Sequence, residues 1–221
     1  MAQHDLDTLR HSAAHIMAAA VQKLWPDAKF DIGPATAEGF YYDFDMAHRL
    51  TPEDLPKIEE EMNAIRKGKL KFERIEVPRA EALALFSARG QTFKLERLAD
   101  IPEGETISLY KLGDFTDLCR GPHVDQSAQV AAFKLVSIAG SYFRGKESNP
   151  MLQRIYGIAF PSKEELNAYV AMVEEAKKRD HRRLGSELEL FSTHEDIGPG
   201  LVCWNPNGAR IRHVIETFWK A

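Results

Sequence analysis

Two short motifs contain the side chains with the clearest capacity for chemistry in this chain. His11 and His15 are four residues apart in an alanine-rich, largely apolar segment, so on a helix their imidazoles share one face. Cys119 and His123 have the same separation, but the Gly-Pro dipeptide between them excludes a helix and predicts a turn. Three imidazoles and one thiol that converge would form either a tetrahedral zinc site or an acid–base pocket.

Each motif also has a simpler explanation. Two ordinary helix histidines would show the first spacing, and Cys119 could be a small buried hydrophobic residue. The chain has only eight histidines and two cysteines, however, and three of the histidines and one cysteine fall into the two matched pairs. A shared site is therefore the favoured interpretation.

The composition is that of an ordinary globular protein. The 221 residues are 44% hydrophobic and 28% charged. No apolar run approaches the roughly 20 residues that span a bilayer, and no secretory signal opens the chain. With only two cysteines, we expect a protein of the reducing cytoplasm that is not associated with a membrane.

Charge is unevenly distributed along the chain. The formal net charge is −4, yet residues 134–183 contain ten Lys and Arg against six Asp and Glu. Such a basic segment predicts contact with phosphates. The run of bases over 177–183 has a second explanation, because basic residues at the end of a helix also complement the helix dipole.

The order of the elements predicts an α+β fold, with helices packed on a largely antiparallel sheet and followed by a long linker helix. Helices are expected over 5–25, 51–68, 78–90 and 162–183, with a final one from Gly208 onward, and strands over 39–45, 72–77, 106–112, 134–140 and 153–160. The stretch 91–95 has no clear pattern, and spacing alone favours a surface position for Lys94. Asp117 lies two residues before Cys119 and should point to the same side of its strand.

In order along the chain, these segments resemble the bacterial threonyl-tRNA synthetases. The resemblance rests on HSAAH from His11, IGPATAEGFYYDFD, CRGPH from Cys119, AGSYFRGKESNPMLQRIYGIAF, KKRDHRRLGSELELF and GPGLVCWNPNGARIRHVIETFW. It covers almost the whole chain and implies an editing domain over 1–160, a linker helix over 161–190 and a truncated start of the class II catalytic domain over 191–221. The small domain that usually precedes the editing domain, and the second and third class II motifs, are absent. The resemblance therefore implies a fragment without aminoacylation activity.

The resemblance implies an enzyme that hydrolyses the ester of mischarged seryl-tRNA(Thr). Threonine exceeds serine by one methyl group, which a binding pocket discriminates by only about 1–3 kcal/mol, so a second hydrolytic site is needed. The residues that match catalytic positions of the family are His11, His15, Lys94 and His123. Those that match substrate-binding positions are Tyr42, Asp117 and Cys119, and Cys119 could be either a nucleophile or a thiol that only lines the pocket. The candidate tRNA contacts in the basic segment are Lys134, Arg144, Lys146, Arg179, Arg182 and Arg183.

The resemblance also bears on cofactors and partners. It implies tRNA(Thr) as the partner, a homodimer in the complete enzyme, and editing without a cofactor, with ATP and zinc used only in the missing catalytic domain. The related alanyl editing domains hold zinc with the same pattern, so zinc bound by His11, His15, Cys119 and His123 stays an alternative. Two other functions also stay open, a non-catalytic tRNA-binding fragment and a structural zinc module.

Overall fold

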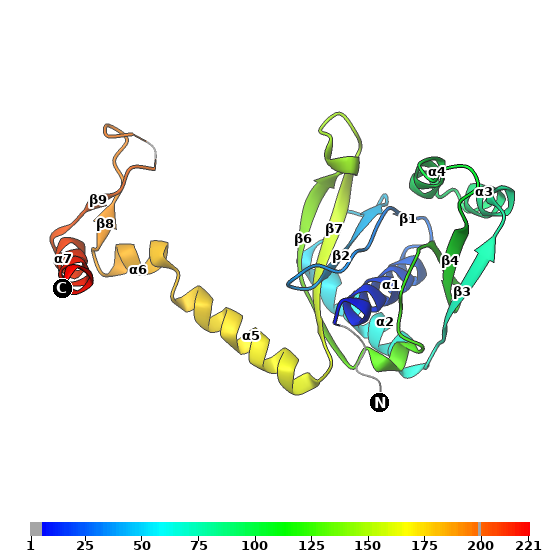
Figure 1. The fold of residues 1–221 in the computed structure, drawn as a ribbon, viewed down its shortest axis with the longest axis horizontal. Coiled ribbons are helices and arrows are strands. Elements are labelled where there is room, and N and C mark those ends of the chain that lie inside the picture. Colours follow the sequence, from blue (N-terminus) through cyan, green and yellow to red (C-terminus); the bar gives the residue numbers. More distant parts are fainter. Residues whose placement is uncertain (1–5, 199) are drawn as a thin grey trace. The chain divides into compact units, whose positions relative to one another are not determined.

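A computed structural model describes residues 6–198 and 200–221 (Figure 1). Contacts divide the chain into two compact units, with the division between Leu166 and Asn167. The predicted domain boundaries after residues 160 and 190 stay predictions. Among the described residues, no helix has both the length and the apolar character needed to cross a membrane.

Helix α1 (Leu6–Leu24) is the central element of the first unit and lies between two sheets (Figure 1). Ala13, Ala14, Ala18 and Ala20 of α1 are fully buried. Their small side chains allow the neighbouring strands to approach the helix closely. The sequence predicted this helix, although its expected start at Asp5 lies outside the described residues.

Both sheets of the first unit are antiparallel, which confirms the predicted α+β fold. The four-stranded sheet has the order β1 (Lys29–Phe30), β2 (Phe40–Asp45), β7 (Met151–Phe160) and β6 (Ala132–Tyr142). The three-stranded sheet has the order β3 (Phe72–Val77), β4 (Ile107–Leu112) and β5 (Phe115–Leu118). Tyr42 in β2 lies opposite Ile155 in β7, and Asp117 in β5 lies opposite Tyr110 in β4.

The remaining helices of this unit pack mainly against α1 and against one another. They are the short 3-10 helix η1 (Pro52–Asp54), α2 (Leu55–Lys67), α3 (Arg79–Ala88) and α4 (Thr92–Ala99), with further 3-10 turns η2 (Ser127–Gln129) and η3 (Phe143–Gly145). Helix α4 was not predicted. Gln91, the N-cap residue of α4, makes no side-chain cap to the helix. Its buried side-chain amide instead accepts the N–H of Phe30 (2.9 Å) and donates to the carbonyl of Ala28 (3.0 Å).

The prediction of one continuous helix over 162–183 is wrong, because the segment forms two helices. At the start of helix α5 (Lys163–Lys178), half of the expected capping box is present: the Glu165 N–H donates to the Ser162 hydroxyl at 3.1 Å, and that hydroxyl donates to the Glu165 carboxylate at 3.0 Å. The helix does not continue to residue 183, because Asp180 leaves helical geometry (φ −56°, ψ 122°). The Asp180 carboxylate accepts the N–H of Arg182 at 2.8 Å and so starts a second helix, α6 (His181–Glu187).

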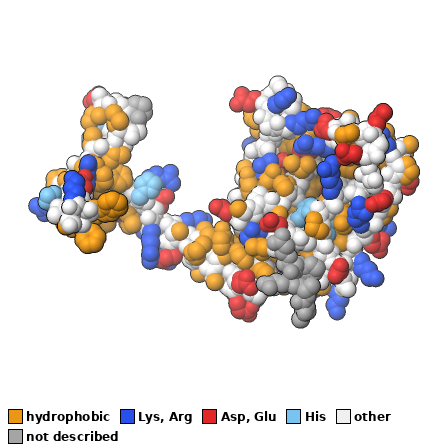
Figure 2. Space-filling model, in the orientation of Figure 1, with side chains coloured by type: hydrophobic (Ala, Val, Ile, Leu, Met, Phe, Trp, Pro, Cys, Tyr) orange, Lys and Arg blue, Asp and Glu red, His pale blue; other side chains and the backbone are white. Residues whose placement is uncertain are grey.

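The second unit ends with a short β-hairpin and one more helix. Strands β8 (Phe191–Ser192) and β9 (Cys203–Trp204) pair, and α7 (Pro206–Lys220) follows. Helix α7 starts two residues before the predicted Gly208, since proline suits the first turn of a helix. Its apolar side chains are exposed, Phe218 and Trp219 most of all, and hydrophobic atoms gather on this part of the surface (Figure 2).

Candidate active site

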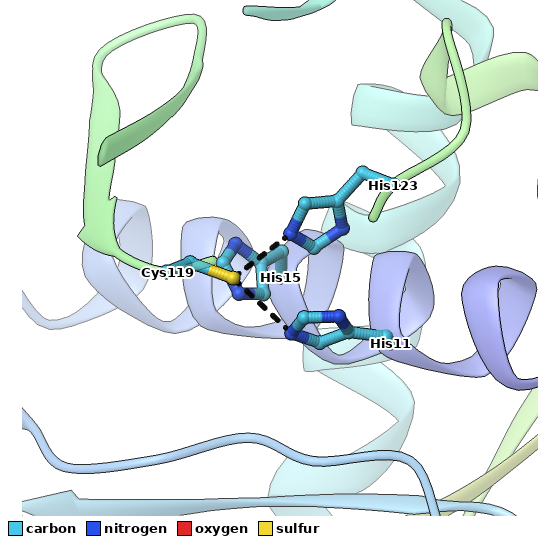
Figure 3. A group of neighbouring side chains, drawn as sticks. All are labelled: His11, His15, Cys119 and His123. Carbon is cyan, nitrogen blue, oxygen red and sulfur yellow. Dashed lines mark hydrogen bonds between the residues drawn. The ribbon is translucent and has the colours of Figure 1, made fainter. Parts of the chain in front are cut away.

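The two motifs form one cluster of side chains (Figure 3). His11 and His15 project from α1, and Cys119 and His123 come from the turn after β5. The Sγ atom of Cys119 lies 3.4 Å from Nε2 of His11 and 3.3 Å from Nε2 of His123. One potential ligand atom from each of the four residues lies within 4.8 Å of the others. Segments more than a hundred residues apart are thus joined as their spacing predicts, while the roles of these residues stay predictions.

The turn that holds Cys119 and His123 requires glycine at its centre. Gly121 has a φ of +76°, and a Cβ atom there would lie 2.3 Å from the hydroxyl of Tyr110. The N–H of Gly121 donates to Cys119 Sγ at 3.2 Å, and its peptide bond to Pro122 is cis. The hydrogen bond from the Gly121 N–H helps to hold the thiol toward α1.

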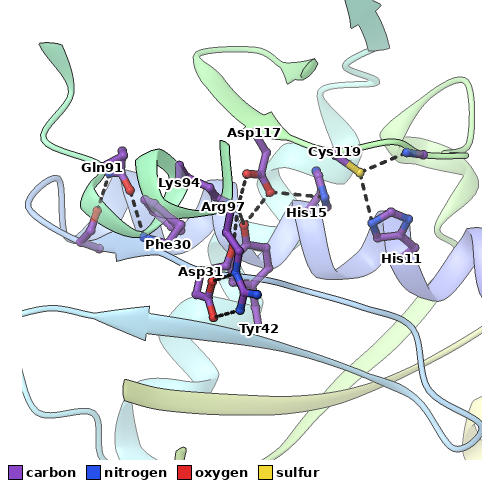
Figure 4. Close-up of polar contacts among 12 residues, drawn as sticks. His11, His15, Phe30, Asp31, Tyr42, Gln91, Lys94, Arg97, Asp117 and Cys119 are labelled. Atoms are coloured by element: carbon purple, nitrogen blue, oxygen red, sulfur yellow. Dashed lines mark hydrogen bonds and ion pairs between the residues drawn. The ribbon is translucent and has the colours of Figure 1, made fainter. Parts of the chain in front are cut away.

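A second, acidic centre lies beside His15 (Figure 4). Asp117 Oδ2 accepts the hydroxyl proton of Tyr42 at 2.5 Å and lies 3.5 Å from Nε2 of His15. Asp117 Oδ1 forms an ion pair with the ammonium of Lys94. The carboxylate therefore joins β2, α1 and α4 at one point in the core.

Lys94 is not the surface lysine that spacing favoured. It is 3% exposed, and besides Asp117 its Nζ donates to the backbone carbonyl of Asp31 (2.5 Å) and to the Tyr42 hydroxyl (3.1 Å). The helix turns this face inward because Arg97, three residues later on α4, makes a bidentate ion pair with the buried Asp31 carboxylate, at 2.8 and 2.9 Å. The local sequence does not reveal this anchor.

Burial keeps the three imidazoles of the cluster neutral. Desolvation lowers the pKa of His11 below its ordinary value, and the charge of Lys94 adds to this, although a hydrogen bond with Pro122 and the charge of Asp117 act in the opposite direction. Desolvation lowers the pKa of His15 further, again with contributions from His11 and Lys94. Desolvation and the neighbouring imidazoles likewise lower the pKa of His123. All three rings therefore offer an unprotonated nitrogen at neutral pH.

The thiol and the phenol of the site are held in their protonated forms. Burial, with the charge of Asp117, raises the pKa of Cys119 to about 12, and the same two causes raise the pKa of Tyr42 well above its ordinary value. Since the thiolate and not the thiol is the nucleophile, Cys119 is poorly suited to attack an ester in this environment.

The donor set and spacing of the histidine–cysteine cluster would fit zinc. Zn–S and Zn–N bonds of about 2.3 and 2.0–2.1 Å in a tetrahedron place the sulfur and nitrogen atoms roughly 3.6 Å apart. The observed Sγ–Nε2 distances of 3.3 and 3.4 Å are close to that value. The cluster can therefore act either through its imidazole lone pairs or as a ligand set.

A groove of about 310 Å³ gives access to His11. Its walls come from the start of α1, from Pro34 and Ala35 before β2, and from Gly121 and Pro122. Of the four clustered residues, His11 alone lines this groove, so it is the ring that a bound molecule would meet first.

The six predicted tRNA contacts are divided between the two units. Lys134, Arg144 and Lys146 belong to the first unit, whereas Arg179, Arg182 and Arg183 belong to the second. All six are exposed. The four arginines pair with carboxylates, with distances of 2.7 Å for Arg144–Asp100, 3.0 Å for Arg179–Glu175, 3.0 Å for Arg182–Asp180 and 2.8 Å for Arg183–Glu187.

Sequence reasoning missed three residues that hold the site together. Asp31 and Arg97 anchor α4, and Ser12 bonds to the ring of His123 at 3.1 Å. The position of Ser12 next to His11 was visible in the sequence, and so was the i, i+3 spacing of Lys94 and Arg97. Nothing in the local pattern pairs Arg97 with a residue 66 positions away.

The neutral imidazoles predict that acid destabilises the first unit. Folding lowers the pKa of these rings, so below pH 6.5 each ring takes up a proton when the protein unfolds. The free energy of unfolding is therefore at its full value above pH 6.5 and decreases as the pH falls below it. Each such ring contributes up to about 1.4 kcal/mol per pH unit to the free energy of unfolding. Urea unfolding of the wild type at pH 7.5, 6 and 5 should show this slope, and His123→Gln should reduce it.

The exposed His213 of α7 supplies the matched control, because His213→Gln removes an imidazole that has no buried environment. It should leave the slope unchanged. Equal slopes in the wild type and His123→Gln would show that the ring of His123 is not held neutral by folding.

Comparison with known proteins finds a family match and several close relatives. The family described as "Threonyl and Alanyl tRNA synthetase second additional domain" matches residues 107–156, the range that contains Asp117, Cys119 and His123. A threonine–tRNA ligase of Dehalococcoides mccartyi is 60% identical over 216 residues, which is 98% of this chain and 37% of that protein. Those of Geobacillus kaustophilus and Clostridium botulinum are 55% and 54% identical, over 96% of this chain and 33% of each relative.

The chain thus spans about a third of the length of the curated relatives it matches. The matches run through both units and include the histidine motif, the pentapeptide and the basic helices. They confirm the resemblance seen in the sequence motifs, and on this evidence the chain belongs to the threonine–tRNA ligase family.

Proposed function

We propose that the first unit hydrolyses the ester of seryl-tRNA(Thr) and spares threonyl-tRNA(Thr). The observation that carries the proposal is a neutral imidazole, His11, at the wall of an open groove, with two further imidazoles and a protonated thiol behind it. A proton acceptor of this kind next to a bound carbonyl group accelerates ester hydrolysis at neutral pH.

The reaction needs only water and the ester. His11 Nε2 accepts a proton from a water molecule in the groove, and the oxygen of that water attacks the carbonyl carbon of the seryl ester. The tetrahedral intermediate then expels the ribose oxygen, which takes the proton back from the imidazolium of His11. Serine and the free tRNA end are the products, and no other reactant is consumed.

Lys94 supplies the positive field in this proposal. Its charge lowers the pKa of both His11 and His15, so its electrostatic influence extends to the cluster. The same influence favours the negative charge that develops on the ester oxygen in the transition state. Lys94 is already paired with Asp117, so this role requires no movement of the lysine into the groove.

Tyr42 and Asp117 are the proposed selectivity residues, and their contacts constrain how they can act. The Asp117 carboxylate is already bonded to Tyr42 and Lys94, so a seryl ammonium group must share it with Lys94. Gly33 packs against Tyr42, since a Cβ atom on Gly33 would lie 2.1 Å from the ring. We propose that this fixed ring excludes the extra methyl group of threonine, as a second sieve requires.

Replacement of the proposed base gives the direct test. His11→Gln should lower the rate of seryl-tRNA(Thr) hydrolysis about 10²-fold or more, because proton transfer contributes roughly 10²–10⁴-fold. The measurement is release of labelled serine and threonine from the two charged tRNAs, side by side. His213→Gln is the control, because it removes an exposed histidine of the other unit.

Wild-type hydrolysis of both charged tRNAs at one rate would contradict the proposed selectivity. Binding of tRNA without any hydrolysis would favour the non-catalytic tRNA-binding function instead. Full activity of His11→Gln would place the base elsewhere.

We further propose that editing in this chain requires no metal ion. Dialysis against a chelator should leave the rate of seryl-tRNA hydrolysis unchanged, and added zinc should lower it because the ligands would be the imidazoles that the reaction uses. Elemental analysis before and after dialysis monitors the metal content. Loss of activity on dialysis, with recovery on zinc, would contradict the proposal, and loss of folding would favour the structural zinc module.

We propose tRNA(Thr) as the partner, held in part by the predicted basic residues. Lys134 and Lys146 make no ion pair with any residue that the structure describes, and the four arginines are paired only at the surface. Exposed ion pairs contribute about 0–1 kcal/mol, so a phosphate can replace the carboxylate at low cost. Homodimerisation and aminoacylation in a longer enzyme are proposals that follow from the family alone.

Salt dependence tests the phosphate contacts. The affinity for tRNA should fall steeply with salt, and neutralising Arg179, Arg182 and Arg183 to Gln should reduce the slope of log K against log salt by up to about 2–3 units. Binding titrations between low and physiological salt measure this slope. The same loss of charge at Arg210, Arg212 and Lys220 of α7 is the control, and an equal effect of both triple variants would contradict a specific contact.

A further inference from the structure

Ser12 is a buried hydroxyl between the two motifs. It follows His11 on α1 and is fully buried. Its Oγ atom has three partners, the carbonyl of Thr8 at 2.8 Å, the N–H of Val124 at 3.0 Å and Nδ1 of His123 at 3.1 Å. The mechanism proposed above does not use this residue.

The hydrogen-bonding capacity of a serine determines the direction of these three bonds. A hydroxyl has one proton to donate and two lone pairs to accept with. The Thr8 carbonyl can only accept, so it receives the hydroxyl proton, and the Val124 N–H can only donate, so it uses one lone pair. The second lone pair faces His123 Nδ1, and that nitrogen must therefore carry a proton.

We propose that Ser12 is a positioning residue that holds His123 as the Nδ1–H tautomer and so directs the lone pair of its Nε2 atom at Cys119. Cys119 Sγ lies 3.3 Å from that nitrogen and has a single proton to donate. With the thiol proton committed to His123, the Nε2 atom of His11 keeps its own lone pair for another donor. That lone pair belongs to the ring that lines the groove.

This arrangement divides the work between two imidazoles that look alike in the sequence. His123 is stacked on Phe72, with ring centroids 4.9 Å apart and planes 11° apart, and it is bonded at both nitrogens. It holds the thiol in place, while His11 exchanges protons with the molecule in the groove. Only the proton exchange by His11 rests on the proposed function. The tautomer of His123 follows from its bond to Ser12, whatever reaction the site performs.

Nitrogen-15 NMR of the full chain tests the inference. The two-bond proton–nitrogen pattern of an imidazole distinguishes its tautomers, and His123 should be in the Nδ1–H form in the wild type. Ser12→Ala should lose this preference, with a fall of about ten- to a hundredfold in kcat for seryl-tRNA and little change in KM, as expected when a residue that orients a functional histidine is removed. Ser12→Thr, which keeps the hydroxyl, should retain the tautomer.

Ser127 offers a matched control. It is also fully buried, and its hydroxyl donates to the carbonyl of Ile65 (2.9 Å) and accepts the N–H of Leu70 (3.0 Å), so neither of these bonds involves a histidine of the cluster. Both Ser127→Ala and Ser12→Ala should lower the melting temperature, but Ser127→Ala should leave the His123 spectrum and kcat unchanged.

Three results would overturn the inference. They are an Nε2–H tautomer of His123 in the wild type, an unchanged tautomer in Ser12→Ala, and a fall in kcat that Ser127→Ala reproduces. A wild type that hydrolyses no seryl-tRNA would instead contradict the proposed function, and the NMR result would still decide the role of Ser12.

Discussion

The burial of α1 between two sheets is the constraint on which the site depends. A polar side chain in such a position must find a partner inside the protein, because an unpaired buried group costs about 1–3 kcal/mol. Arg10 meets this demand by donating to the carbonyls of Thr36 (3.0 Å) and Ala37 (2.8 Å), and Ser12 meets it at Val124. His11 lies between these two residues in the sequence, so the same helix carries the proposed base and holds the segments on either side of it.

The charged and the neutral parts of the site support each other. Lys94 and Asp117 are a buried ion pair whose remaining hydrogen bonds are made by Tyr42 and the Asp31 carbonyl. A buried pair of this kind is destabilising when one partner is removed, so both residues are fixed in place. The imidazoles beside them stay neutral because desolvation disfavours the protonated rings, although the Asp117 carboxylate lies 3.5 Å from Nε2 of His15.

Much of this could be predicted from the sequence, and the exceptions have physical causes. The spacing of His11 and His15 and the Gly-Pro turn after Cys119 were local signals, and the structure joins them. Alternation and proline positions predicted α2, α3 and the main strands of both sheets. Helix α4 and the burial of Lys94 were missed because their determinants are distant, namely the Gln91 bonds to residues 28 and 30 and the Arg97–Asp31 pair. The linker helix ended early because Asp180 caps the start of a second helix, α6. The basic residues on both sides of Asp180 suggested one continuous helix instead.

The pairing of β2 with β7 affects how a growing chain is protected. Residues Phe40 to Phe44 bond to Gln153 to Gly157, so more than a hundred residues are synthesised before β2 has its neighbour on that side. During that interval the strand that carries Tyr42 has an open edge, and one side of α1 is uncovered. Open strand edges and exposed apolar surface favour association with other chains. The helix on which the site is built therefore stays partly uncovered until β7 has been synthesised, and cellular factors that shield unfinished domains would protect it during that interval.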